Sequence, residues 1–204
     1  MKKICIVRET SGIGDILMLS PIVKQLSKDN NVKIDFYTNL SFVSEVEVLR
    51  KNNYIKNIYN IECLDHKLYD EVYDLSYVAY AYEQNGFNFS RQEIFAKYCN
   101  VIPKCFLPVY FNQVFYNFKN KYIAIHTEAA EKRRSWKHEY TLKLIDWICK
   151  NTNYNILYLN QKPLKVVNKK IIDCSNYTIE KCVQLLTGTC FFIGVDSCFM
   201  HFAG

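Results

Sequence analysis

Residues 3–26 read KICIVRETSGIGDILMLSPIVKQL, and this stretch decides the fold. The apolar run 4–7 predicts a short buried strand, and two glycines, Gly12 and Gly14, follow it. Glycines there allow the backbone to turn tightly and to approach a ligand closely. A helix is expected next, because apolar residues recur at the spacing of one helix face: Leu19, Ile22, Val23 and Leu26. A strand, a glycine turn and a helix form the opening unit of a parallel α/β sheet.

The start of this helix has two readings. Ser20 is a good helix cap and Pro21 suits the first helical position, which favours a start at residue 20. Alternatively the helix begins at Asp15 and Pro21 bends it. The sequence leaves both open.

The rest of the chain continues the alternation of strands and helices. Further strands are expected at 32–37, 54–61, 71–75, 122–126, 155–159, 170–174 and 190–195. Further helices are expected at 42–49, 91–99, 140–148 and 179–186, and from 197 onward. The aromatic-rich segment 77–89 is expected to be a loop, and 106–111 an extended segment. Such alternation predicts right-handed βαβ units and parallel sheets.

Two series of strands and helices are joined near residues 115–120. The prediction is an α/β protein with two Rossmann-like domains, 1–117 and 118–204, facing a cleft. The second series has fewer units, and the chain ends at Gly204, a few residues into an apolar helix. Because natural termini usually lie beyond an element, the second domain is interpreted as truncated.

The composition indicates which kinds of binding partner and which cellular compartment to expect. The net charge of +6 suits an acidic partner such as a nucleotide phosphate, but zinc-finger and aromatic RNA-binding signatures are missing, so no nucleic acid is expected. Nine cysteines, none in a C-x-x-C pair, indicate buried thiols in a reducing compartment. No apolar run has the length of a membrane span. We therefore expect a cytoplasmic protein, peripheral at a membrane surface.

The glycine turn lacks two features of a dinucleotide site. Leu17 stands where a third glycine would be, and the second expected strand is followed by Thr38 and Asn39 rather than an acidic residue. Asp15 is the distinctive residue, because ligands of parallel sheets bind at the edge where it lies. It either caps the helix or takes part in chemistry, and the two roles are compatible.

Two further motifs follow strands of the second series. Arg134 precedes the helix expected at 140–148, where a cation is unfavourable unless an anion binds. The last strand ends in Gly194 and passes through Asp196 and Ser197 into a helix that carries His201 one turn later. Amide groups at such a turn can hold a phosphate or sugar hydroxyl, although Ser197 is also an ordinary cap.

Together the motifs resemble glycosyltransferase family 9, the heptosyltransferases of lipopolysaccharide core synthesis. Gly14-Asp15 with Pro21 six residues later matches the first family motif. Arg134-Ser135-Trp136 matches a Lys-x-Trp pair, with arginine for lysine. Residues 196–201 match Asp-Ser-Gly-x-Met-His except at Cys198, where glycine is usual.

This resemblance implies a GT-B fold and inverting transfer of a sugar from a nucleoside-diphosphate sugar, with an ADP-sugar favoured. The acceptor would be a lipopolysaccharide or other glycan at the inner membrane face, and no metal or other cofactor would be required. Asp15 would be the general base, with Gly12 and Gly14 in the acceptor-side loop. The donor would be held by Thr127, Arg134, Asp196, Ser197 and His201.

Two other functions stay open on the sequence. Truncation could leave a non-catalytic remnant or a sugar-nucleotide-binding protein. A GT-B-like sugar-nucleotide epimerase would share the fold but needs more acid and base residues.

Overall fold

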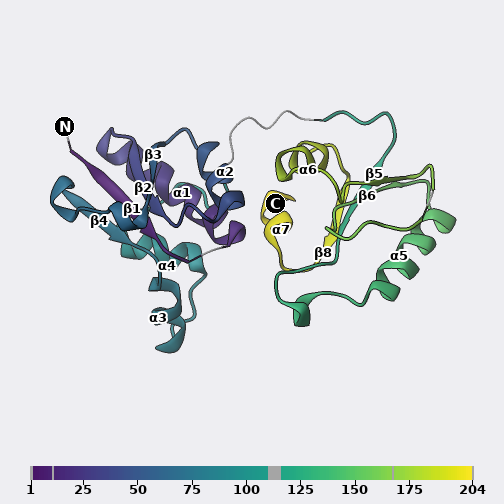
Figure 1. Cartoon of the computed structure of the whole chain (residues 1–204). Helices are drawn as coiled ribbons and strands as arrows, with labels where there is room; N and C mark the ends of the chain where they lie inside the picture. Colours follow the sequence, from purple (N-terminus) through teal and green to yellow (C-terminus); the bar gives the residue numbers. More distant parts are fainter. Residues whose placement is uncertain (1, 11, 110–115, 167, 204) are drawn as a thin grey trace. The chain divides into compact units, whose positions relative to one another are not determined.

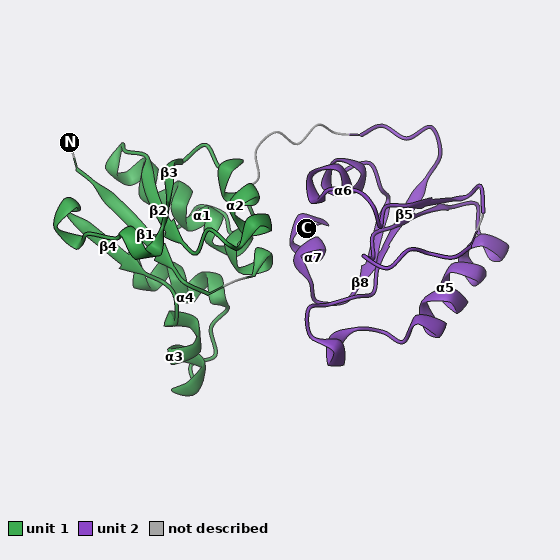
Figure 2. Ribbon diagram, viewed as in Figure 1, with its two compact units in different colours: residues 1–112 green, residues 113–204 purple. Residues whose placement is uncertain are grey.

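The computed structural model describes residues 2–10, 12–109, 116–166 and 168–203. The chain divides into two compact units, residues 1–112 and 113–204, drawn in green and purple in Figure 2. Each unit contains a four-stranded sheet in which all strands run parallel. The predicted α/β class with two parallel sheets is confirmed.

The first unit has the strand order β3-β2-β1-β4. Its strands are β1 (Ile4–Arg8), β2 (Ile34–Thr38), β3 (Ile55–Asn60) and β4 (Glu71–Asp74). Its helices are α1 (Ile13–Asn30), α2 (Val43–Arg50), α3 (Val78–Gln84) and α4 (Arg91–Tyr98), with 3-10 turns η1 (Ile61–Cys63) and η2 (His66–Leu68) between β3 and β4. All five residues of β1 are buried, as its central place in the sheet requires.

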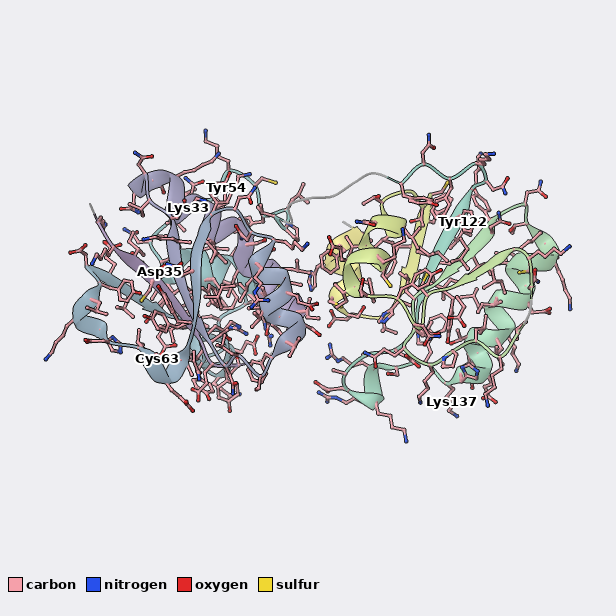
Figure 3. The ribbon with its side chains drawn as sticks, turned by 45° about the horizontal axis from the view of Figure 1, so that its top comes forward. Lys33, Asp35, Tyr54, Cys63, Tyr122 and Lys137 are labelled. Atoms are coloured by element: carbon pink, nitrogen blue, oxygen red, sulfur yellow. The ribbon has the colours of Figure 1, made fainter. Side chains whose placement is uncertain are left out.

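Parallel strands bring their carboxyl ends to one edge of the first sheet. In Figure 3, Lys33 and Tyr54, which precede β2 and β3, lie at one end of the unit, and Cys63, which follows β3, lies at the other. The turn after β1 therefore lies at the carboxyl edge, where ligands of such sheets bind. Helix α1 starts from that turn and packs beside α2 and α4.

Helix α1 begins at Ile13, so the reading in which Ser20 caps it is wrong. Pro21 lies inside the helix, where it has no N–H to donate to the carbonyl of Leu17. The Ser20 hydroxyl donates to that carbonyl instead, at 2.6 Å. The hydroxyl oxygen also accepts from the Val109 amide at 2.7 Å. Ser20 thus satisfies the carbonyl that proline leaves free, which explains how the helix continues.

Two local predictions in the first unit are wrong. Residues 78–84 of the expected loop form α3, although only Ala79 on it is buried, so no apolar stripe identified the helix. Of the extended segment expected at 106–111, residues 106–109 belong to no strand, and residues 110 and 111 lie outside the described residues.

The second unit has the strand order β7-β6-β5-β8. Its strands are β5 (Tyr122–His126), β6 (Asn155–Tyr158), β7 (Ile171–Asp173) and β8 (Phe191–Gly194). Its helices are α5 (His138–Asn151), α6 (Ile179–Leu186) and α7 (Cys198–Ala203), with a 3-10 turn η3 (Lys132–Arg134) before α5. Thr178 directly precedes the helix expected at 179–186, where threonine is a reasonable cap. The structure confirms this, because its hydroxyl accepts from the Lys181 amide at 3.3 Å.

Helices cover both faces of the second sheet (Figure 1), with α5 on one side and α6 and α7 on the other. Helical spacing in the sequence places Tyr140, Leu144, Trp147 and Ile148 on the buried stripe of α5, and this prediction is partly wrong. Its buried residues are Thr141, Ile145 and Ile148, whereas Tyr140 and Trp147 are about half exposed. Because the prediction relied on the large aromatic side chains, it placed the buried face one residue away from its true position.

Candidate functional site

Asp15 lies in the first turn of α1, at the carboxyl edge of the first sheet. The N-cap of α1 is Gly12. Its φ of 138° lies in a region that residues other than glycine rarely adopt. The Gly12 amide donates to Glu45 Oε1 at 3.0 Å, and no side chain caps the helix. Gly14 lies within the first turn. Asp15 therefore does not cap α1, and its carboxylate is used otherwise.

Arg8, the last residue of β1, holds one oxygen of Asp15. Its Nη2 donates to Asp15 Oδ2 at 2.7 Å, and its Nη1 donates to the Leu75 carbonyl at 2.9 Å. The guanidinium also lies over the Phe95 ring, 5.5 Å from its centroid. Only 5% of the Arg8 side chain is exposed, and among the described residues its Nε finds no partner. Arg8 is thus fixed by groups on α1 and α4 and by the residue that follows β4.

Arg91, the first residue of α4, holds the other oxygen. Its Nη1 donates to Asp15 Oδ1 at 3.0 Å, and its Nε donates to Glu83 on α3 at 3.0 Å. The side chain of Arg91 is 43% exposed, against 16% for Asp15. One oxygen of Asp15 therefore faces a buried arginine and the other faces an exposed one.

The two guanidinium groups respond oppositely to these surroundings. Burial lowers the pKa of Arg8, and the Asp15 carboxylate opposes that effect only in part. Burial also lowers the pKa of Arg91, but its hydrogen bonds to Glu83 and Asp15 outweigh it, so that the pKa is raised. Both side chains stay cationic, because the pKa of arginine begins far above neutrality.

In the second unit, the connection from β5 to α5 folds back on its own start. The Trp136 amide donates to the Thr127 carbonyl at 2.9 Å, and the Ser135 hydroxyl accepts from the Ala129 amide at 2.9 Å. These bonds close a loop that carries η3. Arg134 is thereby placed near the carboxyl end of β5, as the parallel sheet predicts. Figure 3 shows Lys137, which follows this loop, at the opposite end of the unit from Tyr122.

Thr127 itself is buried and its hydrogen bonds are internal. Its hydroxyl pairs with Thr141 Oγ1 at 2.8 Å and accepts from Asn160 Nδ2 at 2.8 Å. Its amide donates to Asn160 Oδ1 at 2.7 Å. Thr127 therefore ties the end of β5 to α5 and to Asn160, two residues after β6.

Arg134 and Asp196 are brought together although 62 residues separate them. Arg134 Nη1 donates to Asp196 Oδ2 at 3.0 Å and to the Asp196 carbonyl at 3.3 Å. Arg134 Nη2 also lies 3.7 Å from Glu131 Oε1. Arg134 is 38% exposed and Asp196 63% exposed, so the pair is open to solvent. An anionic ligand can compete with a carboxylate for such a guanidinium.

Ser197 pairs with His126, the last residue of β5. Ser197 Oγ and His126 Nδ1 lie 2.9 Å apart, and the imidazole packs on Phe199 with ring centroids 4.7 Å apart. Burial lowers the pKa of His126 to about 4, so the ring is neutral at pH 7. Gly194 is required beside it, because a Cβ there would lie 2.8 Å from the His126 carbonyl oxygen.

His201 lies on α7 and is partly exposed. No hydrogen bond or ion pair joins it to another described residue. Within the described ranges, no group of three or more His, Cys, Asp or Glu side chains could hold a metal ion. In the same ranges, no helix combines the length and the apolar character that crossing a bilayer needs.

The sequence reasoning missed three polar residues at the two sheet edges: Arg8 and Arg91 in the first unit, and His126 in the second. Arg8 and His126 occupy equivalent places, each ending the central strand of its sheet. A polar residue that ends an apolar central strand was the available signal. Arg91 had no such signal, because only the packing of α4 against α1 brings it to Asp15.

No protein-family model matches this sequence, and no curated protein matches it either. Solved structures do match. The dodecameric iron-containing glycosyltransferase TibC from enterotoxigenic E. coli H10407 has a TM-score of 0.71 at 13% identity over 99% of this chain. E. coli heptosyltransferase WaaC with ADP-2-deoxy-2-fluoro heptose has a TM-score of 0.63 at 12% identity over 98% of this chain. A family 9 glycosyl transferase from Veillonella parvula DSM 2008 has a TM-score of 0.71 at 12% identity over 99% of this chain.

The fold is that of the heptosyltransferases. At such low identity the likeness concerns the fold alone, and it agrees with the GT-B-like arrangement expected from the sequence. The chain spans 55% of TibC, 85% of WaaC and 77% of the Veillonella protein. The predicted motifs thus lie in a fold that solved glycosyltransferases share.

Proposed function

We propose that this chain acts as an inverting glycosyltransferase, alone or as part of a longer protein. It would move a heptose-like sugar from a nucleoside-diphosphate sugar, with an ADP-sugar favoured, to a hydroxyl of a lipopolysaccharide or other glycan. The fold supports the class, because matching structures include TibC in complex with ADP-D-beta-D-heptose and WaaC with ADP. With a lipopolysaccharide acceptor, the reaction would take place in the cytoplasm, at the inner membrane face.

Asp15 is the proposed general base. It would take the proton from the acceptor hydroxyl while that oxygen attacks the anomeric carbon of the donor sugar. The bond from the anomeric carbon to the diphosphate oxygen breaks, and its electron pair leaves with the nucleoside diphosphate. The products are an inverted glycoside, the nucleotide and a protonated Asp15, which returns its proton to water. No covalent intermediate is needed.

Arg134 is the proposed holder of the diphosphate. A planar guanidinium donates two parallel hydrogen bonds to phosphate oxygens, and its charge stabilises the leaving group as negative charge develops. Asp196, which now accepts from Arg134, would be released to accept from sugar hydroxyls. Ser197 and His201 would line the sugar, and Thr127 would support the loop from beneath through its buried hydrogen bonds.

One observation carries the proposal. Asp15 lies at the carboxyl edge of a parallel sheet and is held there by two arginines rather than used as a helix cap. A carboxylate oriented in this way, on a fold shared with ADP-heptose enzymes, supports a role in proton transfer. The pairing of Arg134 with Asp196 is the matching feature of the second unit.

Calorimetric titration with ADP, UDP and GDP tests the donor half of the proposal. We expect the wild-type chain to bind ADP most tightly and Arg134→Ala to weaken binding at least about tenfold, because a charged hydrogen bond is worth about 1.5–3 kcal/mol. Arg133→Ala is the matched control. Its side chain is 83% exposed and pairs with Glu131, so its loss should leave affinity nearly unchanged.

Two results would contradict this assignment. One is an equal loss of affinity in the two arginine variants, which would indicate a general charge effect. The other is the failure of all three nucleotides to bind, which would favour the non-catalytic alternative.

A further inference from the structure

We propose that the two arginines at Asp15 have different tasks, an inference that rests on the proposed function. Arg8 is a positioning residue that fixes the carboxylate through Oδ2. Arg91 is a displaceable partner that occupies Oδ1 until the acceptor hydroxyl takes its place. Oδ1 is then the oxygen that receives the proton.

Burial separates the two arginines. The Arg8 side chain is 5% exposed and makes two hydrogen bonds and one ring contact, to Asp15, Leu75 and Phe95. Moving it would take its donor from the Leu75 carbonyl in a buried place and would remove one of the two arginines from Asp15, which is costly. Arg91 is 43% exposed, so water can replace its hydrogen bond to Asp15 at little cost. Only the Arg91 side of the carboxylate can therefore open.

The carboxylate of Glu83 can hold Arg91 after Arg91 has left Asp15. Its Nε stays bonded to Glu83 when Nη1 leaves Asp15, since these bonds use different nitrogens. Glu83 lies on α3 and is itself about 42% exposed. The arginine can thus swing away from Oδ1 while α3 still holds it.

The charges around Asp15 indicate which kind of group takes the place of Arg91 at Oδ1. Arg8 and Arg91 balance Asp15 and Glu83, so the cluster has no excess charge that would favour an anion. Oδ1 loses a donor when Arg91 leaves and needs another in its place. A neutral sugar hydroxyl supplies that donor and is also the group from which a proton must be taken. The geometry therefore points to a hydroxyl, rather than a phosphate, in contact with Oδ1.

Steady-state transfer from ADP-heptose to heptose-free lipopolysaccharide separates the two tasks. We expect Arg91→Met to lower the acceptor KM about threefold or more with kcat within about twofold, because a competitor for Oδ1 is gone. We expect Arg8→Lys to lower kcat about tenfold or more at an unchanged acceptor KM, because the base is misplaced. Arg50→Met, an exposed arginine on α2, is the control. A loss of kcat in Arg91→Met at unchanged KM would overturn the proposal.

NMR of the guanidinium groups in the unmutated chain gives a readout that needs no turnover. We expect the Arg8 Nη protons to give separate, slowly exchanging signals and the Arg91 protons to be averaged by rotation. Equal immobility of both groups would overturn the proposal. If the wild-type chain transfers no sugar, the proposed function fails, and this comparison still decides whether Arg91 is the displaceable partner.

Discussion

At the residue scale, His126 shows how burial shapes the second unit. Its neutral ring forms a hydrogen bond with the Ser197 hydroxyl and packs on Phe199, in a place where an imidazolium would lose its hydration. The pKa of about 4 lies below the ordinary 6.5, so the unfolded chain binds a proton first as the pH falls. Folding should therefore become less favourable below pH 6.5, down to about pH 4.

We predict that this single group costs about 2 kcal/mol of folding free energy between pH 7 and pH 5. Urea unfolding of the wild type and of His126→Gln at both pH values measures it. The variant has no group that titrates at residue 126, so its stability should fall less over that interval. An identical fall in both proteins would show that His126 does not cause the loss.

The sequence identified Asp15, Arg134 and Asp196 because each lies between a predicted strand and the apolar part of the helix that follows it. The structure places Arg134 against Asp196. Arg8 was overlooked because arginine is almost never fully buried, and only Asp15, Leu75 and Phe95 together make its burial tolerable. Such compensation depends on the fold and cannot be found from neighbours in the sequence.

At the element scale, patterns of burial decided which predictions succeeded. Helix α6 was predicted well, because its cap and apolar stripe coincide with the structure. Helix α3 was missed, because its surface is mostly exposed and its aromatic side chains do not repeat with the helix. Periodicity reports burial rather than helicity, so it cannot identify a helix that buries almost nothing.

The capping box of α4 yields a prediction at this scale. Ser90 Oγ accepts from the Glu93 amide, and the Ser90 amide donates to Glu93 Oε2 at 2.7 Å. We expect Ser90→Ala to lower stability by about 1 kcal/mol and to loosen the first turn, which carries Arg91. Amide hydrogen exchange at Glu93 and Ile94, whose amides donate to Ser90, should quicken, and Ser90→Thr should restore protection. Unchanged exchange in Ser90→Ala would show that the box does not hold this turn.

At the scale of the whole molecule, each unit carries one part of the proposed chemistry. The first unit presents Asp15 at the edge of its sheet, and the second presents Arg134 and Asp196 at the edge of its own. The alternation of strands and helices was enough to predict both sheets, because parallel pairing needs such crossovers. The strand orders, in contrast, depend on which faces pack together, and the sequence does not state them.

Sugar transfer by Asp15→Asn tests the central claim most directly. Product formation from ADP-heptose and heptose-free lipopolysaccharide is compared with that of the wild type and of Asp29→Asn, a control near the exposed end of α1. We expect a loss of turnover of about 100-fold or more in Asp15→Asn, with ADP affinity and folding retained and the control unaffected. Transfer by Asp15→Asn at the wild-type rate would contradict it.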